Sequence, residues 1–384
     1  MRYLSPWVIR DLQNKMVFIG GPRQSGKTTL AQGLQENFPH SIYLNWDDDR
    51  QRREILDRKW SQKNTLILLD ELHKYKRWKS WLKGVYDTEK KDHTFLVTGS
   101  ARLDVYRRGG DSLLGRYHYW RLHPFTLSEK PAEMDVQEAF QRLMTVGGFP
   151  EPFLGGDERE ARRWRRERLD RVVSDDIRDL ENIRDIRTLE LLVDLLRSRV
   201  GGPIVIKNLA EDLQVSQPTV KHWLEILERM YYIFRVYPYS TNLPRATLKP
   251  AKVYFYDNAE VEGDAGAKFE NLVATHLLKT IHFLEDRDGY RYQLRYLRDK
   301  EGREVDFVLL REKKLCELIE VKWSDEQISP SLRYYQEKLQ SPSATQIVGQ
   351  KIRAFEKGPI RVVSALEDLV TLERETLLDV STHK

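Results

Sequence analysis

Short, continuous apolar runs recur along the first hundred residues of this 384-residue chain. They are Met16 to Ile19, Thr65 to Leu69 and Phe95 to Thr98. An apolar run of four or five residues without alternation is typical of a strand that is buried on both faces of a parallel sheet. Helical patterns separate the runs, so this part of the chain predicts an α/β domain with a parallel sheet.

The loop after the first run has the glycine-rich pattern of a phosphate-binding loop. Its residues, with the start of a helical pattern, are Gly21, Pro22, Arg23, Gln24, Ser25, Gly26, Lys27, Thr28 and Thr29. Backbone N–H groups of such a loop curve round a polyphosphate, and the following helix directs the positive end of its dipole at the same oxygens. We expect Lys27 to contact the β and γ phosphates and Thr28 to ligate Mg²⁺.

Two carboxylates, Asp70 and Glu71, follow the second run. Ligands of open α/β sheets bind at the carboxyl ends of strands, so these residues are expected beside the loop. Asp70 is predicted to hold Mg²⁺ through water, and Glu71 to orient or deprotonate the water that attacks the γ-phosphate. Ser100, just after the third run, is either a sensor of the γ-phosphate or a helix cap.

These motifs together resemble the AAA+ ATPase superfamily, and in particular a prokaryotic group with a C-terminal nuclease-like domain. The resemblance covers residues 17–154 and rests on segments 21–29, 69–74, 98–100, 114–116 and 147–151. It implies ATP hydrolysis with Mg²⁺ in a homo-oligomer, with a ring as one form. An arginine of one subunit often completes the site of its neighbour in such ATPases. Arg116 is the candidate for this finger, and Arg102, Arg107 and Arg108 compete with it.

Composition agrees with a multidomain chain that has room for two or three domains. The formal net charge of +5 is compatible with nucleic acid as a partner but does not require it. Cys316 is the single cysteine, so an intramolecular disulfide and a thiolate zinc cluster are both excluded. No segment has the roughly 20 apolar residues of a membrane span. We therefore expect a cytoplasmic protein with no membrane partner.

An arginine-dense helical segment, Arg159 to Arg171, follows the ATPase-like part. It also contains acidic residues, so a solvated face with helix-surface ion pairs explains it better than a stripe that tracks phosphates. The helices up to about Arg199 are expected to form a lid or connector. Residues 201–203 read Gly-Gly-Pro and mark a break.

Two short helical patterns follow the break, and residues 232–237 and 252–256 are rich in strand formers. This order resembles a winged helix-turn-helix, with the strands as the wing. The recognition helix would then present Gln217, Thr219, Lys221 and His222 to DNA. The alternative is that the winged fold is only a brace between domains.

The last part of the chain contains a second set of ionisable residues. Asp306 lies in one apolar run, Glu320 and Lys322 lie in the next, and Glu270 lies on an amphipathic helical run. The two runs predict a hairpin that places Asp306, Glu320 and Lys322 on one sheet face. These residues resemble the PD-(D/E)xK nuclease signature. The resemblance implies that Glu270, Asp306 and Glu320 hold Mg²⁺ or Mn²⁺ and that Lys322 orients the attacking water. The alternative is an ordinary strand with a Glu–Lys pair on one face.

The expected domains are an AAA+ ATPase core at 1–155, a helical lid or connector at 156–200, a winged helix-turn-helix at 201–256 and an α/β restriction-endonuclease-like domain at 257–384. The leading hypothesis is an ATP-hydrolysing, DNA-binding protein that couples its nucleotide state to a metal-dependent nuclease module. The alternative is an ATP-gated switch that binds DNA or protein and has an inert nuclease-like domain.

Overall fold

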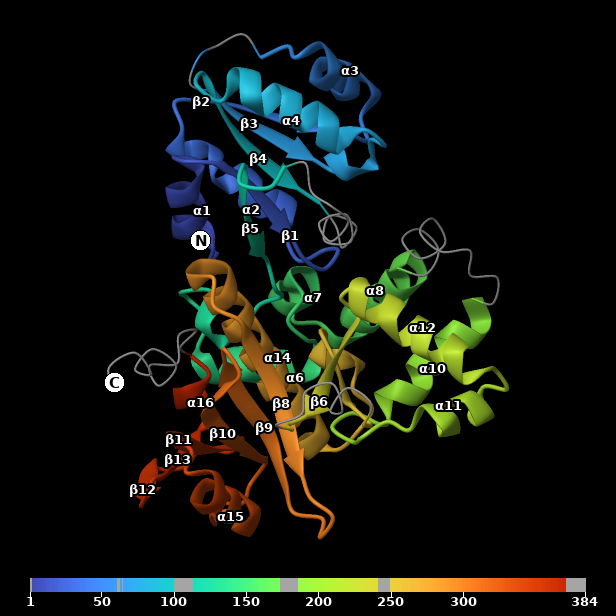
Figure 1. Cartoon of the computed structure of the whole chain (residues 1–384), viewed down its shortest axis with the longest axis vertical. Coiled ribbons are helices and arrows are strands. Elements are labelled where there is room, and N and C mark those ends of the chain that lie inside the picture. Colours follow the sequence, from blue (N-terminus) through green and yellow to red (C-terminus); the bar gives the residue numbers. More distant parts are fainter. Residues whose placement is uncertain are drawn as a thin grey trace. The chain divides into compact units, whose positions relative to one another are not determined.

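A computed structural model describes residues 2–60, 63, 65–99, 113–172, 186–240 and 249–370 (Figure 1). The chain divides into two compact units. The first unit comprises Met1–Pro124 with Arg229–Tyr231, and the second comprises Phe125–Glu228 with Tyr232–Lys384.

The first unit contains a five-stranded sheet in the order β2-β3-β4-β1-β5, and every neighbouring pair is parallel. The strands are β1 (Met16–Gly20), β2 (His40–Asn45), β3 (Thr65–Asp70), β4 (His93–Thr98) and β5 (Tyr117–Arg121). The helices are α1 (Ser5–Leu12), α2 (Lys27–Gly33), α3 (Asp49–Asp57) and α4 (Trp78–Glu89), with short 3₁₀ turns η1 (Gln35–Asn37) and η2 (Leu72–Lys74). The three strands predicted from apolar runs are therefore confirmed.

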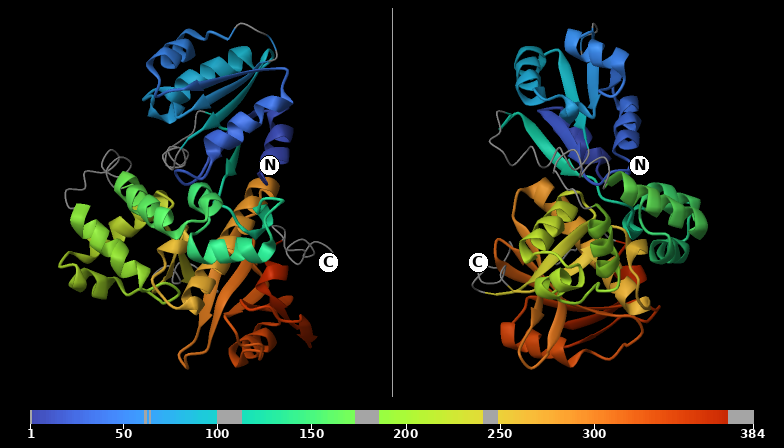
Figure 2. Two further views of the ribbon diagram at one scale, coloured as in Figure 1. Left: turned by 180° about the vertical axis from the view of Figure 1, so that it is seen from behind. Right: turned by 90° about the vertical axis from the view of Figure 1, so that its right-hand side faces the viewer.

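Helices cover both faces of this sheet, as Figure 2 shows from two sides. Alternate side chains of the central strands, Phe18 and Val97 among them, form one core cluster with Trp78 and Leu82 of α4. Helices α1 and α2 pack against β1, β3 and β4. Burial on both faces explains why the strands are continuous apolar runs.

The strand order determines which loops meet. β4 lies between β1 and β3, and its last residue, Thr98, is in register with Ile19 on one side and Asp70 on the other. The phosphate-binding loop after β1 and the carboxylates after β3 therefore lie at the same sheet edge, on either side of Thr98. This is the edge at which open parallel sheets bind ligands.

The second unit contains an eight-stranded mixed sheet in the order β12-β13-β11-β10-β9-β8-β6-β7. Its strands are β6 (Ile233–Pro238), β7 (Lys252–Phe255), β8 (Tyr292–Arg298), β9 (Glu304–Arg311), β10 (Lys314–Lys322), β11 (Ser343–Val348), β12 (Phe355–Lys357) and β13 (Ile360–Ser364). Its helical elements are η3 (Leu127–Glu129), α6 (Val136–Thr145), α7 (Pro150–Gly155), α8 (Glu158–Arg171), α10 (Ile186–Arg197), α11 (Ile206–Asp212), α12 (Gln217–Arg229), η5 (Asn258–Glu260), α14 (Ala265–Asp288), α15 (Pro330–Leu339) and α16 (Ala365–Asp368). The predicted hairpin of β9 and β10 is confirmed.

Two expectations about domain organisation differ from the structure. Residues 125–155, expected in the ATPase core, lie in the second unit. There Phe140 of α6 packs against Phe269 and Trp323, so its apolar partners come from much later in the chain. Apart from Arg229–Tyr231, the expected lid, winged-helix and nuclease-like segments belong to this same compact unit.

The two strands expected to form a wing pair with each other antiparallel, and they also belong to the large sheet. β6 pairs with β8 in parallel through Tyr237 and Pro238, and β7 is the edge strand beyond β6. The Tyr254 ring of β7 also lies 5.5 Å from the Phe307 ring of β9. The two helices of the expected helix-turn-helix are present, and Ser216 Oγ accepts a hydrogen bond from the N–H of Thr219 at the start of α12.

Helix α14 is the longest described helix of the second unit, and it packs against β7, β8 and β10. Asp264 accepts a hydrogen bond from the N–H of Ala267 at its first turn, and Gly289 ends it with a positive φ of 77°. No described helix has the length and apolar character needed to span a membrane.

His276 connects α14 to η3. Its Nε2 accepts a hydrogen bond from the N–H of Leu127 at 3.1 Å, and its Nδ1 lies 2.8 Å from the carbonyl oxygen of Leu272. The accepting role of Nε2 assigns the ring proton to Nδ1, which donates to that carbonyl. Protonation of Nε2 would place a hydrogen against the Leu127 N–H. Burial lowers the pKa of His276 to about 3.

We predict that His276 makes the second unit sensitive to acid. Its folded pKa is below the ordinary value, so unfolding takes up a proton, and the stabilisation present at neutral pH is lost as pH falls from about 6.5 toward 3. The slope is up to about 1.4 kcal/mol per pH unit. His276→Gln keeps a polar group but cannot titrate. Urea unfolding at pH 6.5 and 5.0 gives the fall in the free energy of unfolding between the two pH values. This fall should be smaller by about 2 kcal/mol in the variant than in the parent protein. Equal losses in the two proteins would contradict this role.

Candidate nucleotide site and acidic cluster

The loop after β1 has a backbone shape that needs glycine. Gly21 has a φ of 134°, and a Cβ there would lie 2.3 Å from the carbonyl oxygen of Leu122. Gly26, at the N-terminus of α2, has a φ of 89°. These two positions allow the chain to turn from the sheet into α2 and direct the N-terminus of the helix toward the loop.

Lys27 and Arg2 hold this loop from two sides. Lys27 is buried, and its Nζ donates to the carbonyl oxygens of Gly21 at 3.1 Å and Pro22 at 2.6 Å. Arg2 donates from Nη1 to the carbonyl of Ser25 at 2.9 Å and from Nη2 to the carbonyl of His123 at 2.6 Å. The loop is therefore fixed to the segment after β5. Arg2 was not predicted, because no local pattern links residue 2 to residue 25.

Asp70 is the centre of the site. Its buried carboxylate accepts hydrogen bonds from Thr28 Oγ1 at 2.7 Å, from the Tyr43 hydroxyl at 2.8 Å and from Thr98 Oγ1. Burial, then the Asp70 carboxylate, raises the pKa of Tyr43, so its hydroxyl remains a donor. One side chain thus joins α2, β2, β3 and β4. Tyr43 and Thr98 were not predicted as site residues.

Glu71 follows Asp70 in a left-handed conformation, with a φ of 56°, and its N–H donates to the carbonyl of Thr98. Its Oε2 lies 3.5 Å from Lys74 Nζ and 3.7 Å from His73 Nε2. Burial raises the pKa of Glu71, and the Lys74 ammonium partly offsets this effect. A carboxylate with a raised pKa is a stronger base, which suits the predicted role toward water.

The residues of this site fit a magnesium nucleotide. Thr28 and Asp70 supply hard oxygen ligands, and their oxygens already lie within hydrogen-bond distance. Ser25 Oγ and Gln24 Oε1 are buried and make no hydrogen bond to any described residue, so they are available to a ligand. Arg23 is half-buried, and Thr29 is exposed in the first turn of α2. Ser100 lies outside the described residues, as do Arg102, Arg107 and Arg108.

Arg116, the expected finger, has a partner within its own unit. Its Nε and Nη2 donate to the two carboxylate oxygens of Asp87 at 2.8 and 2.9 Å, which lowers the pKa of Asp87. Its carbonyl accepts from the N–H of Met16 at the start of β1, whereas the phosphate-binding loop follows the end of β1. Arg116 is therefore at the opposite sheet edge from the nucleotide site of its own chain.

The second unit brings the predicted nuclease-like residues together. Lys322 Nζ lies 2.8 Å from Glu320 Oε1, and Asp306 Oδ2 accepts a hydrogen bond from the N–H of Val321 at 2.9 Å. Burial and the Asp306 carboxylate raise the pKa of both Glu270 and Glu320. The expected cluster of carboxylates on one side of the sheet is thus present.

A lysine that was not predicted lies among these carboxylates. Lys252 Nζ on β7 lies 3.1 Å from Glu270 Oε1, 2.5 Å from Glu304 Oε1 and 3.4 Å from Asp306 Oδ1, and its side chain is 1% exposed. Burial alone would lower the pKa of Lys252, but the three carboxylates outweigh it and raise the pKa. An ammonium has three N–H donors, so these contacts can use all of them.

The predicted metal site is therefore not formed in this arrangement. Among the described residues, no three His, Cys, Asp or Glu side chains are placed to hold a metal ion, so the set Glu270, Asp306 and Glu320 does not fit one. The physical reason is that the Lys252 ammonium already compensates Glu270 and Asp306. The sequence contains a signal for this arrangement, because Lys252 begins a buried strand and a buried ammonium needs carboxylate partners.

Comparison with known proteins agrees with the geometry of the first unit. Residues 13–130 match the model of an AAA domain. This part of the chain is therefore similar to an AAA domain. Residues 137–261 and 265–366 match two domains of unknown function, DUF8612 and DUF4143.

Two relatives are similar to large parts of the chain. The uncharacterized protein MJ1544 of Methanocaldococcus jannaschii is 26% identical over an alignment of 347 residues, and the match covers 82% of this chain and 76% of that protein. The uncharacterized protein Rv2008c of Mycobacterium tuberculosis is 24% identical over 244 residues. The match covers 63% of this chain and about half, 54%, of the mycobacterial protein.

Two solved structures are similar at lower identity. The Walker-type ATPase PABY2304 of Pyrococcus abyssi has a TM-score of 0.41 and 15% identity, over 67% of this chain and 93% of that one. The Orc1 protein of Aeropyrum pernix, solved in complex with DNA, has a TM-score of 0.33 and 14% identity, over 71% of this chain and 90% of that one.

The Lys252 contacts predict a specific response to its removal. Lys252→Met leaves Glu270, Glu304 and Asp306 without their common cation, so we expect a loss of about 3–5 kcal/mol in the free energy of unfolding. Millimolar Mn²⁺ should restore part of it, because a divalent ion can then enter among three carboxylates. Urea unfolding with and without Mn²⁺ measures both effects.

Lys279→Met is the matched control. Lys279 is also fully buried, but it pairs with Glu129 and not with the three carboxylates around Lys252, so Mn²⁺ should not restore the stability of this variant. A Lys252→Met protein as stable as the parent would show that the ammonium does not compensate the cluster.

Proposed function

We propose that this chain is an ATP-hydrolysing, DNA-binding switch of the AAA type whose nuclease-like sheet does not cleave DNA. The observation that supports ATP hydrolysis best is the arrangement around Asp70, which brings Thr28, Thr98 and Glu71 to the end of the phosphate-binding loop. The observation that favours an inert sheet is the position of Lys252 among Glu270, Glu304 and Asp306.

Each residue of the site in the first unit has a separate role in hydrolysis. Lys27 neutralises phosphate charge, and the loop N–H groups together with the N-terminus of α2 bind the phosphate oxygens. Thr28 and Asp70 would hold Mg²⁺, which supplies positive charge to the transferred phosphoryl group when bound. Glu71 orients the attacking water and takes its proton. Thr98 and Tyr43 keep the Asp70 carboxylate in place.

Assembly belongs to the proposal as well. A homo-oligomer in which Arg116 completes the site of a neighbouring subunit would require the guanidinium to leave Asp87. Asp87→Asn would then increase, rather than decrease, the availability of Arg116. A ring is one assembly that places every arginine at a neighbouring site.

DNA binding is proposed for the second unit. The helix pair α11 and α12 has a capped turn, and Gln217, Lys221 and His222 of α12 are exposed, whereas Val220 and Leu224 are buried. This arrangement suits contact with a DNA groove even though the expected wing is part of the large sheet. Nucleotide-dependent changes in affinity would make the protein a switch.

The nuclease hypothesis requires a rearrangement of the acidic cluster. A divalent ion would have to displace Lys252 from three carboxylates. Separation of a buried ammonium from its partners is costly, so the inert alternative is the better explanation of this geometry.

The proposal predicts distinct effects for two substitutions in the nucleotide site. Lys27→Ala should lose both MgATP binding and turnover, because its ammonium contacts the phosphates. Glu71→Gln should keep MgATP binding but lower kcat by about 100-fold or more, since it removes the base and leaves the phosphate contacts. Steady-state phosphate release and nucleotide titration measure the two quantities.

Lys91→Ala, at an exposed position of the first unit, is the control and should match the parent. Turnover in Lys27→Ala equal to that of the parent would remove the ATPase proposal. DNA cleavage with Mg²⁺ or Mn²⁺ that disappears in Asp306→Ala would remove the inert-sheet part alone.

A further inference from the structure

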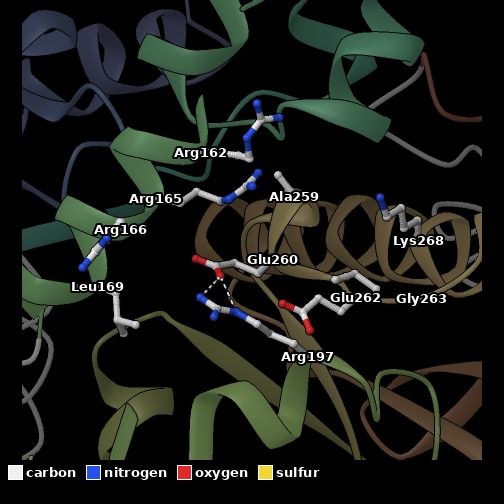
Figure 3. A pocket seen from close by; sticks show the side chains of 11 residues that line it. Arg162, Arg165, Arg166, Leu169, Arg197, Ala259, Glu260, Glu262, Gly263 and Lys268 are labelled. Atoms are coloured by element: carbon white, nitrogen blue, oxygen red, sulfur yellow. Dashed lines mark hydrogen bonds and ion pairs between the residues drawn. The ribbon is translucent and has the colours of Figure 1, made fainter. Parts of the chain in front are cut away.

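A positively charged pocket lies within the second unit, between α8, α10, η5 and the start of α14 (Figure 3). Its volume is about 590 Å³. The cationic side chains that line it are Arg162, Arg165, Arg166, Arg197 and Lys268. Two carboxylates, Glu260 and Glu262, line it as well. These residues come from separate segments of the chain, so only the fold assembles the pocket.

Three of the arginines share one face of α8. Residues 162, 165, 166 and 169 are spaced by three, one and three positions, which places them together along a helix. Two acidic residues of α8 bind arginines outside the pocket, since Glu160 pairs with Arg163 and Glu167 pairs with Arg171. The solvated-face interpretation holds for those pairs but not for the pocket side of the helix.

The arginines at the pocket differ in how far they are already compensated. Arg162 has one distant partner, Glu158, at 3.8 Å. Arg165 and Arg166 make no ion pair with any residue that the structure describes, and Arg165 is half-buried. Half-burial reduces solvent screening of that charge, which strengthens its attraction for an anion.

The opposite wall adds little negative charge. Arg197 binds Glu260 through Nε and Nη2 at 2.9 and 2.6 Å, and Tyr232 also donates to Glu260, so this carboxylate is compensated. Glu262 is exposed and is the remaining acid of the lining. Lys268 lies in the first turn of α14, where the positive end of the helix dipole has the same sign. The pocket therefore has a surplus of positive charge.

The chemistry of the lining selects among anions. Guanidinium groups bind phosphate oxygens in a two-point geometry. Arg162 and Arg166 are separated by four helix positions, about 6 Å along the axis, so they suit successive phosphates rather than one carboxylate. The lining contains no aromatic ring on which a nucleobase could stack. A free nucleotide is thus a poorer fit than a polymer recognised through its phosphates.

We propose that this pocket binds the phosphodiester backbone of DNA without reading its sequence. The inference rests on the DNA-binding part of the proposed function and adds a second contact surface to α12. Arg165 and Arg166 supply two guanidinium groups that make no ion pair with a described residue, although the Asp257 carboxylate attracts Arg165, and Lys268 supplies a third positive charge from the other wall.

Fluorescence anisotropy with labelled single-stranded and duplex DNA of two unrelated sequences tests the pocket. The full chain and Arg165→Ala/Arg166→Ala are compared between 50 and 300 mM NaCl. We expect the double variant to bind both sequences about tenfold or more weakly at low salt, and its plot of log K against log salt to be shallower by about 2. Arg163→Ala, on the same helix but outside the pocket, should bind like the parent.

The remaining outcomes distinguish a lost phosphate contact from a folding defect and from a failure of DNA binding as a whole. Arg165→Lys/Arg166→Lys keeps the charge and should restore the salt slope, which separates a lost phosphate contact from a folding defect. Parental affinity and slope in the double alanine variant would overturn the pocket but leave DNA binding elsewhere intact. Absence of DNA binding by the parent would overturn the pocket and DNA binding together. ATP turnover, measured in parallel, is independent of both, and displacement of the DNA by free ATP in Lys27→Ala would assign the pocket to nucleotides instead.

Discussion

One buried carboxylate, that of Asp70, organises the proposed nucleotide site. A buried charge is costly unless hydrogen bonds satisfy it, and three hydroxyl groups from α2, β2 and β4 do so here. The strand order brings these donors to a single edge, because β4 lies between the strand that precedes the loop and the strand that ends in Asp70. Tertiary structure and chemistry thus depend on the same contacts. Without Asp70 the loop would still follow β1, but its Thr28 would lose the partner that places it beside Glu71.

The same physical constraint has a different solution in the second unit. Glu270, Glu304 and Asp306 are also gathered at a sheet, but there the compensating group is the ammonium of Lys252. The hydroxyl groups around Asp70 are neutral, so a metal ion can still bind there and leave again. The Lys252 ammonium, in contrast, is a cation that belongs to the chain and stays in place. This contrast separates the two sites of the chain, with a reaction proposed at the first and a binding role proposed for the unit that contains the second. The cationic pocket beside α8 gives that unit a surface suited to phosphates.

The sequence was sufficient where the chemistry is local. The phosphate-binding loop, Asp70 and Glu71 lie in contiguous segments, and the buried strands of the first unit follow directly from apolar runs. Tyr43, Arg2 and Lys252 were missed because their partners are 27, 23 and 18 or more positions away and are brought near only by strand pairing and loop packing.

The domain boundary expected near residue 155 differs from the structure for a related reason. Asn258 donates to the carbonyl of Leu143, and such contacts tie residues 125–155 to segments more than 100 positions later in the chain. The expected wing had the right composition for strands, but composition does not specify which sheet a strand joins.

The most direct test of the central claim is calorimetric titration of ATP into the full chain with Mg²⁺ and with EDTA in its place. The account predicts saturable heat with Mg²⁺ and clearly weaker binding with EDTA, because the Thr28 and Asp70 oxygens then have no metal ion to bind. Asp70→Asn should abolish the difference between the two conditions. Equal binding with and without Mg²⁺ in the parent protein, or no heat at all, would contradict the account.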